Sequence, residues 1–173
     1  VTTDPGATPE GEPLCADGYD DTFNGGCNSD PAVFSTIECG EIVAGEAGNF
    51  LNTADPPANS RDTDWYLFTL TATTQITYKG RAEFDFQMLI VGDTLGDCSD
   101  TPILDSAAPD PCTDATVVEI LEAGTYYLWA GPGGFDQGTP CGSTYQIELE
   151  CEEIVAECPA AIDGSGDVGF TDL

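Results

Sequence analysis

The chain has 173 residues and a formal charge of −29, because 32 Asp and Glu face only 3 Lys and Arg, and it contains no histidine. This length suits one domain with tails, and 40% hydrophobic residues suffice for a folded core. So negative a surface excludes nucleic acid and anionic membranes as partners, and the missing histidine excludes Ser–His–Asp triads, Cys–His pairs and His-ligated metals. No apolar run approaches the ~20 residues of a membrane helix, so we expect no membrane span.

Three regions follow one another along the chain. Residues 1–14 are rich in Pro, Thr and Glu and predict an extended N-terminal arm. Residues 15–151 predict the folded domain, which opens with a turn-rich acidic loop at 15–31. Residues 152–173 change in composition and predict an appended tail. Because the chain begins with Val and shows no signal peptide, we expect a mature secreted protein.

Short segments of β-branched and aromatic residues, separated by turn signals, recur through the domain. Segments 64–71 and 84–91 have two apolar faces, as a central sandwich strand would, and segments 116–121 and 125–130 predict a hairpin. No helical period of useful length occurs. The pattern predicts an all-β sandwich or jelly roll of seven or eight short antiparallel strands. The expected strands are 36–44, 64–71, 75–79, 84–91, 101–106, 116–121, 125–130 and 143–150.

Eight cysteines, an even number without any C-x-x-C pair, favour disulfides formed in an oxidising compartment over a zinc or iron–sulfur site. The pair Cys15 and Cys27 flanks one loop, and the pair Cys98 and Cys112 flanks another, so each pair could close its loop locally. Cys141 and Cys151 bracket an extended run of roughly 30 Å and should not bond to each other. The remaining two cysteines are Cys39 and Cys158.

Acidic side chains gather in loops with Gly, Pro and Asn, where short Asp and Asn side chains supply the six to eight oxygens that calcium prefers. One candidate set lies in the acidic loop, although its spacing matches no standard calcium loop. Another flanks Thr63 just before a core strand, where aspartates could equally cap a turn. The predicted ligands are Asp17, Asp20, Asp21, Asn24, Asp62 and Asp64. A merely solvated acidic surface is the alternative.

Two stretches resemble a known family. RDTDWYLF at 61–68 and EAGTYYLWA at 122–130 are similar to the D-x-D-W-Y-x-F … G-x-Y-x-L pattern of bacterial pre-peptidase C-terminal domains. The resemblance covers residues 15–151. It implies a secreted, non-catalytic β-sandwich that often binds calcium and accompanies other secreted proteins.

The tail CPAAIDGSGDVGFTDL at 158–173 resembles a type I dockerin repeat. The resemblance places Asp163, Ser165 and Asp172 at calcium-ligand positions 3, 5 and 12. Position 1 is Ala161, where the family has an acid, and the helix that normally follows is missing. The alternative is that this segment lies extended against the edge of a sheet.

The three cations, Arg61, Lys79 and Arg81, are expected to pair with carboxylates. Trp65 and Trp129 could offer a platform for glycans, but their strand positions favour the core. With no nucleophile elbow, phosphate loop or metalloprotease motif, we expect no enzyme.

The sequence therefore predicts an extracellular structural protein that is supported by calcium. It would assemble into a filament or surface layer when a terminal segment adds as a strand to a neighbouring copy. The alternative is a non-catalytic accessory module of a secreted enzyme or adhesin, which binds carbohydrate or docks on a partner.

Overall fold

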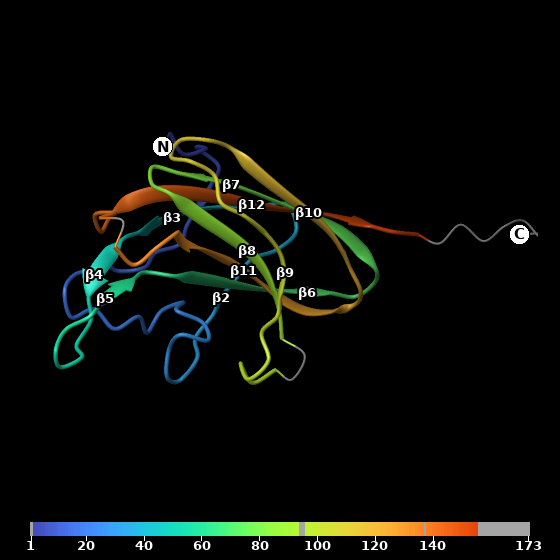
Figure 1. Cartoon of the computed structure of the whole chain (residues 1–173). Coiled ribbons are helices and arrows are strands. Elements are labelled where there is room, and N and C mark those ends of the chain that lie inside the picture. Colours follow the sequence, from blue (N-terminus) through green and yellow to red (C-terminus); the bar gives the residue numbers. More distant parts are fainter. Residues whose placement is uncertain (1, 94–95, 137, 156–173) are drawn as a thin grey trace, which may run out of the picture.

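The structure, a computed structural model, describes residues 2–93, 96–136 and 138–155, and these residues form a β-sandwich without helices. Figure 1 shows the strands in two facing layers. No helix in this part of the chain is long and apolar enough to cross a membrane. The strands are β1 (Thr8–Pro9), β2 (Ser35–Thr36), β3 (Glu41–Ala47), β4 (Asn49–Leu51), β5 (Asn59–Arg61), β6 (Asp64–Leu70), β7 (Thr74–Ala82), β8 (Phe86–Gly92), β9 (Ile103–Ala107), β10 (Ala115–Leu121), β11 (Gly124–Pro132) and β12 (Ser143–Glu153).

The two main sheets have five strands each, in the orders β1-β3-β12-β7-β10 and β2-β6-β11-β8-β9, and β4 pairs with β5 in a small third sheet. Pairing is antiparallel except at two edges, where the two-residue strands β1 and β2 lie parallel to β3 and β6. The predicted hairpin of segments 116–121 and 125–130 is wrong. β10 pairs with β7, whereas β11 pairs with β6 and β8, so the turn between them crosses from one sheet to the other.

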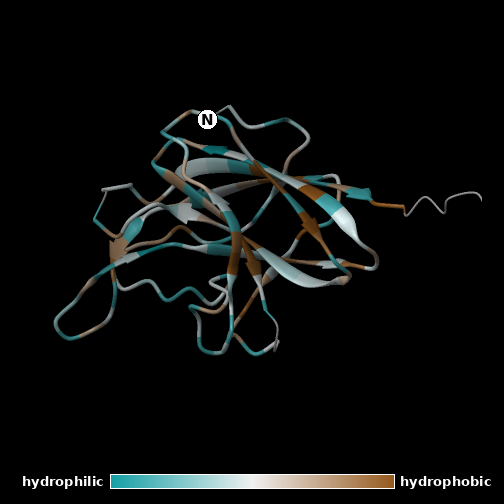
Figure 2. Cartoon of the chain, turned by 45° about the vertical axis from the view of Figure 1, so that its right-hand side comes forward, coloured by the Kyte–Doolittle hydropathy of each residue, from teal (hydrophilic) through white to brown (hydrophobic). Residues whose placement is uncertain are grey.

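The core forms because inward and outward side chains alternate along each strand. On β7, Ile76 and Tyr78 are completely buried, while Gln75, Thr77 and Lys79, which alternate with them, are only partly buried. Figure 2 shows hydrophobic stretches on strands of both sheets. The largest fully buried side chains between the sheets include three tyrosines, Tyr66, Tyr78 and Tyr145.

A second apolar cluster covers the outer face of β6, β8 and β11, which explains why two of these strands have two apolar faces in the sequence. Trp65, Tyr127 and Trp129 are all buried there. Phe34, from the segment that follows the acidic loop, stacks on Tyr127 with ring centroids 4.6 Å apart. The expectation that Trp65 and Trp129 belong to the core is confirmed, so neither ring is available as a glycan platform.

Three disulfides join distant parts of the chain: Cys15–Cys141, Cys27–Cys98 and Cys39–Cys151. The local pairs proposed from the sequence are therefore wrong. Each local loop is held instead to a different part of the sandwich, 71 to 126 residues away in sequence. Cys141 and Cys151 have different partners, as their spacing predicted. Cys112 is free, and Cys158 lies outside the described residues.

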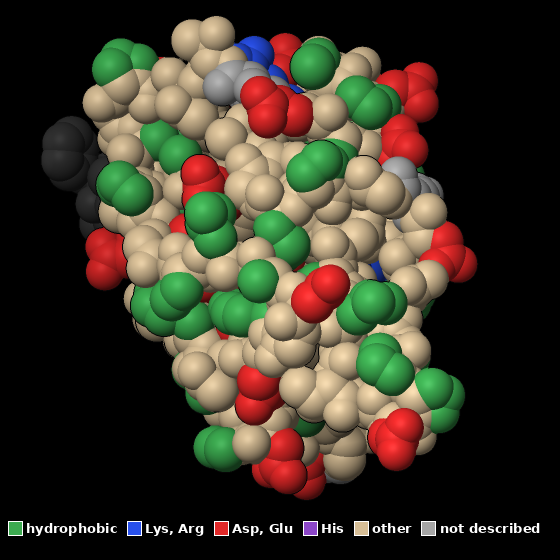
Figure 3. Space-filling view, turned by 90° about the vertical axis from the view of Figure 1, so that its left-hand side faces the viewer, with side chains coloured by type: hydrophobic (Ala, Val, Ile, Leu, Met, Phe, Trp, Pro, Cys, Tyr) green, Lys and Arg blue, Asp and Glu red, His purple; other side chains and the backbone are tan. Residues whose placement is uncertain are grey.

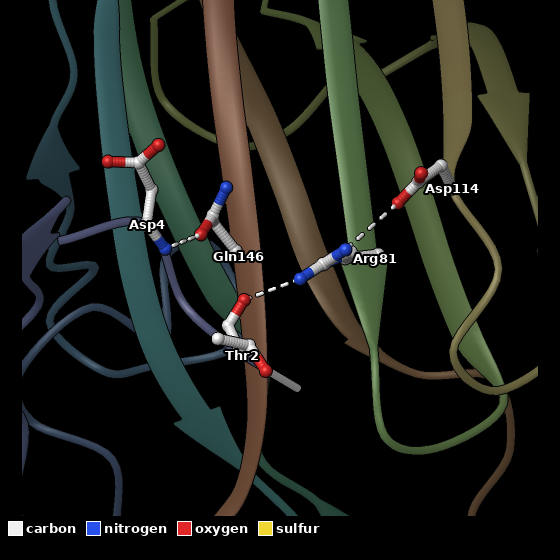
Figure 4. Close-up of polar contacts among 5 residues, drawn as sticks. All are labelled: Thr2, Asp4, Arg81, Asp114 and Gln146. Carbon is white, nitrogen blue, oxygen red and sulfur yellow. Dashed lines mark hydrogen bonds and ion pairs between the residues drawn. The ribbon is translucent and has the colours of Figure 1, made fainter. Parts of the chain in front are cut away.

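The N-terminal arm is fastened to its own domain. Beyond the pairing of β1 with β3, the backbone amide of Asp4 donates a hydrogen bond to Gln146 Oε1 at 2.6 Å. Arg81 donates to the carbonyl of Thr2 and pairs with Asp114, and these contacts hold the arm across the outer face of the first sheet (Figure 4). The terminal segment thus adds as a strand to the edge of its own sheet.

Of the three cations, two pair with carboxylates as predicted. Lys79 contacts Glu148 and Glu150, and Arg81 contacts Asp114. Arg61 makes no such pair with a described residue. Its guanidinium donates to the Pro132 carbonyl and lies 4.8 Å from the ring centroids of both Trp129 and Phe135.

Gly26 gives a test of how the acidic loop packs on β6. Its φ is +56°, and a Cβ there would lie 2.1 Å from Trp65 Cγ. Gly26→Ala should therefore combine left-handed backbone strain with overpacking, and lower the free energy of unfolding by about 3 kcal/mol or more. Gly40→Ala is the matched control, because φ is +87° but no atom lies within 4 Å. It should cost only about 1–2 kcal/mol in urea unfolding. Equal losses would contradict the packing argument.

Candidate metal centre

Five carboxylates meet at one edge of the sandwich, and they come from three separate segments. Glu10 and Glu12 lie in the arm, Asp21 lies in the acidic loop, and Asp62 and Asp64 lie at the start of β6. Oxygens of Glu10, Glu12 and Asp64 all lie within 4.8 Å of one another, and so do oxygens of Glu12, Asp21 and Asp62. Glu12 belongs to both groups. We call these five residues the acidic cluster.

The arm reaches the cluster because β1 runs along β3 and delivers Glu10 to the space between the sheets. The Glu10 amide donates to the Ala44 carbonyl at 3.0 Å. Its Oε2 accepts hydrogen bonds from the hydroxyls of Tyr66 at 3.0 Å and Tyr145 at 2.8 Å. Tyr19 donates to the carboxylate of Glu12. Both glutamates are therefore held by tyrosines, and Tyr66 and Tyr145 belong to the core.

Asp62 and Asp64 are the most deeply buried acids of the cluster, at 2% and 0% exposure. The alternation of β6 explains this for Asp64, which points to the same inner face as Tyr66 and Phe68. No N–H or hydroxyl donor reaches either carboxylate oxygen of Asp64, which faces the carboxyl of Glu12, and none reaches Oδ1 of Asp62. Buried carboxylates in native proteins are normally paired or hydrogen-bonded, so these oxygens lack a partner that the fold implies.

The acidic loop brings Asp21 to the cluster through a tight turn. Its Oδ1 accepts the backbone amides of Phe23 and Asn24, while its Oδ2 is buried without a partner. A side chain at Gly25 would place a Cβ 2.4 Å from that Oδ2, so only glycine fits there. Asn24 is fully buried, and neither polar atom of its side chain is hydrogen-bonded.

The electrostatics of the acidic cluster disfavour five negative charges. Burial first, and the neighbouring charges of Glu12, Asp21 and Glu10 second, raise the pKa of Asp62 to about 9. Burial likewise raises the pKa of Glu12 to about 7 and holds the pKa of Asp64 well above its usual range. No Lys or Arg of the described residues forms an ion pair with these acids.

Two solutions exist for such a cluster: several carboxyls stay protonated, or a cation occupies it. Calcium binds oxygen at about 2.3–2.6 Å, so two oxygens on one ion lie no more than roughly 5 Å apart. The spacing within each group of the acidic cluster meets that limit. A polar cavity of about 170 Å³, lined in part by Tyr19, Asp21 and Thr63, lies beside the cluster.

The structure brings together only some of the predicted ligands. Asp21, Asp62 and Asp64 join the cluster, and Asn24, three residues after Asp21, donates its backbone amide to Asp21 Oδ1. Asp17 and Asp20 do not join it: Asp17 is exposed and accepts the amide of Leu51, and Asp20 is exposed. The dockerin-like residues Asp163, Ser165 and Asp172 lie outside the described residues.

Sequence reasoning missed Glu10 and Glu12. They are two positions apart in the arm, and this Glu-x-Glu spacing is the only local signal that they share a site. Their partners at Asp62 and Asp64 are some fifty residues away, so the pairing of β1 with β3 decides their role.

No family model and no curated protein matches the chain. Among solved structures, one match is the pre-peptidase C-terminal domain of a collagenase from Bacillus anthracis. It is 16% identical, has a TM-score of 0.46, and covers 67% of this chain and 93% of that chain.

The raised pKa values predict how the stability of the metal-free protein varies with pH. In the unfolded chain these acids lose their protons near pH 4, whereas in the folded chain Glu12 and Asp62 lose theirs near pH 7 and 9. The folded state therefore binds more protons across this window, so its stability should fall as pH rises from 6 to 9.

The measurement is the urea midpoint of the metal-free protein at pH 6, 7.5 and 9, a range in which surface carboxylates are already ionised. Asp62→Asn should flatten the fall, whereas Asp105→Asn, on β9, should not. A metal-free midpoint that rises with pH would contradict the assignment.

Proposed function

We propose that this chain is a non-catalytic, extracellular β-sandwich module in which calcium binds the acidic cluster and joins the N-terminal arm to the body. The observation that carries the proposal is Asp64, whose two carboxylate oxygens are fully buried among four other carboxyl groups and are reached by no N–H or hydroxyl donor. An uncompensated buried charge costs several kcal/mol, so a partner cation would contribute strongly to stability.

The chemistry of the donors favours calcium among the common divalent ions. All ligands are oxygens, which suits calcium and magnesium, whereas zinc prefers histidine and cysteine. Magnesium requires near-ideal octahedral geometry and retains waters, whereas calcium accepts many carboxylates in irregular arrangements. Five carboxylates from three unrelated segments form such an irregular arrangement.

Three disulfides support an extracellular location, because such bonds persist in oxidising compartments. The role of the ion would be structural. Glu10 and Glu12 belong to the arm, and Asp62 and Asp64 belong to the body, so one bound cation would link both. The inward direction of Asp64 and the tyrosines over Glu10 favour an ion over a larger substrate.

Calcium binding is tested directly by calorimetric titration of the metal-free protein with calcium chloride. At a calcium concentration 100 times Kd, each bound ion should stabilise the fold by about 2.7 kcal/mol and raise Tm by about 5–10 °C. Asp64→Asn should weaken binding at least tenfold, whereas Asp20→Asn, an exposed neighbour of the cluster, should leave the Kd unchanged. If both variants bound calcium as tightly as the wild type, the acidic cluster would be ruled out as the site.

The stoichiometry gives a separate prediction. Because the acidic cluster consists of two groups that share Glu12, we expect two calcium ions per chain. Asp21→Asn should weaken the binding of only one of the two ions, and Glu12→Gln should weaken the binding of both. Titrations of both variants would distinguish the two groups, and a single ion in the wild type would contradict this prediction.

A further inference from the structure

Cys112 is the one described cysteine without a disulfide partner, and its side chain is exposed. Six of the eight cysteines are used in the three disulfides, so the other one left is Cys158, which lies outside the described residues. Two remaining thiols in an oxidising compartment favour a fourth disulfide.

The fold keeps these two cysteines apart within one chain. The amide of Cys112 donates to the Ala82 carbonyl, while the amide of Ile154, just past β12, donates to the Thr73 carbonyl. Ala82 and Thr73 are nine positions apart along β7, which is about 30 Å at the rise of a strand. Figure 1 shows β12 running out at the end of the sandwich opposite to the loop that precedes β10.

The chain beyond β12 is too short to close this distance. Cys158 is four positions after Ile154, a stretch that spans at most about 14 Å, and a disulfide requires Cα atoms within about 7 Å. Together the chain segment and the disulfide reach about 21 Å, which is less than the separation of about 30 Å between Thr73 and Ala82. Cys158 could meet the Cys112 of its own chain only if the end of β12 separated from β7.

Cys112 stands directly before an open sheet edge. β10 pairs with β7 on one side. Its other side is hydrogen-bonded to no strand of the described residues, although β9 of the facing sheet lies nearby. Its outer face is apolar, since Val118 is 49% exposed and Ile120 is 56% exposed, and Glu119 is its only charged residue. The free backbone groups of such an apolar edge strand can form hydrogen bonds with an extended segment of another chain.

We propose that the C-terminal segment 156–173 of a second copy lies along β10 and forms a disulfide between its Cys158 and Cys112. The segment has eighteen residues, more than enough to cover the seven residues of β10, and Ile162, Val168 and Phe170 supply apolar side chains. Two thiols lose two protons and two electrons to a small disulfide such as oxidised glutathione, which is reduced to two thiols.

Each copy offers one Cys112 and one Cys158, so the contact is head-to-tail and can continue from copy to copy. The acidic cluster contributes nothing to this contact. Failure of calcium binding would therefore leave this proposal intact, and failure of the cross-link would leave the calcium site intact.

The test uses two full-length variants, Cys112→Ser and Cys158→Ser, in a glutathione redox buffer. Each variant alone should remain monomeric on non-reducing gels, and an equimolar mixture should give a 1:1 dimer, because only the mixture contains one Cys112 and one Cys158. Peptide mapping of the dimer should identify the Cys112–Cys158 bond, and the wild type should form a ladder. A dimer of either variant alone, a wild type with an internal Cys112–Cys158 bond, or a mixture that stays monomeric would overturn the proposal.

The position of the segment on β10 is tested in the same mixture. Val118→Asp, placed on the copy that supplies Cys112, should slow dimer formation at least tenfold. Leu51→Asp, on β4 in the small third sheet, is the matched control and should leave the rate unchanged, since Leu51 is 41% exposed and lies on a different sheet. Equal rates in both would overturn the assignment to β10.

Discussion

The burial of the Asp64 carboxyl between the sheets is the constraint on which the site depends. β6 must turn alternate side chains into the core to bury Tyr66 and Phe68, and the same alternation places the Asp64 carboxylate between the sheets. Water cannot solvate it there, and the neighbouring groups are mostly other acids. Either a proton or a cation must compensate for this charge. The arm contributes Glu10 and Glu12 to the cluster around Asp64, and the acidic loop contributes Asp21.

Two disulfides hold the arm and the acidic loop at the edge of the sandwich where the acidic cluster lies. Cys15–Cys141 holds the end of the arm, and Cys27–Cys98 holds the acidic loop over the second apolar cluster. Both segments lack long strands of their own, so propensity alone would leave them loose. The disulfides and the aromatic packing under Phe34 make them parts of the body. Figure 3, which views the end that carries β4 and β5, shows acidic side chains spread over the surface with few Lys or Arg atoms among them.

Local patterns in the sequence were sufficient for the β-sandwich class, since alternation in segments such as 64–71 and 143–150 directly reflects which face is buried. They failed where the answer depends on distant partners. The residues of the turn after β10 suit a hairpin and a crossing to the other sheet equally well, so they do not decide how β11 pairs. The disulfides followed spatial rather than sequence neighbours, and Glu10 and Glu12 acquire a role only through β1. Asp62 and Asp64 could be proposed from the sequence because they adjoin a recognisable core strand.

The separation of these partners along the chain also bears on how the molecule forms. The residues that hold the arm, Gln146 and Tyr145, are among the last of the domain to be synthesised, and Cys15 bonds to Cys141. Contacts of such high sequence separation are slow to form. Within the domain, the arm is therefore synthesised before β12 but takes its place only after β12 is available. Any ion held by the arm could therefore enter only a nearly complete domain.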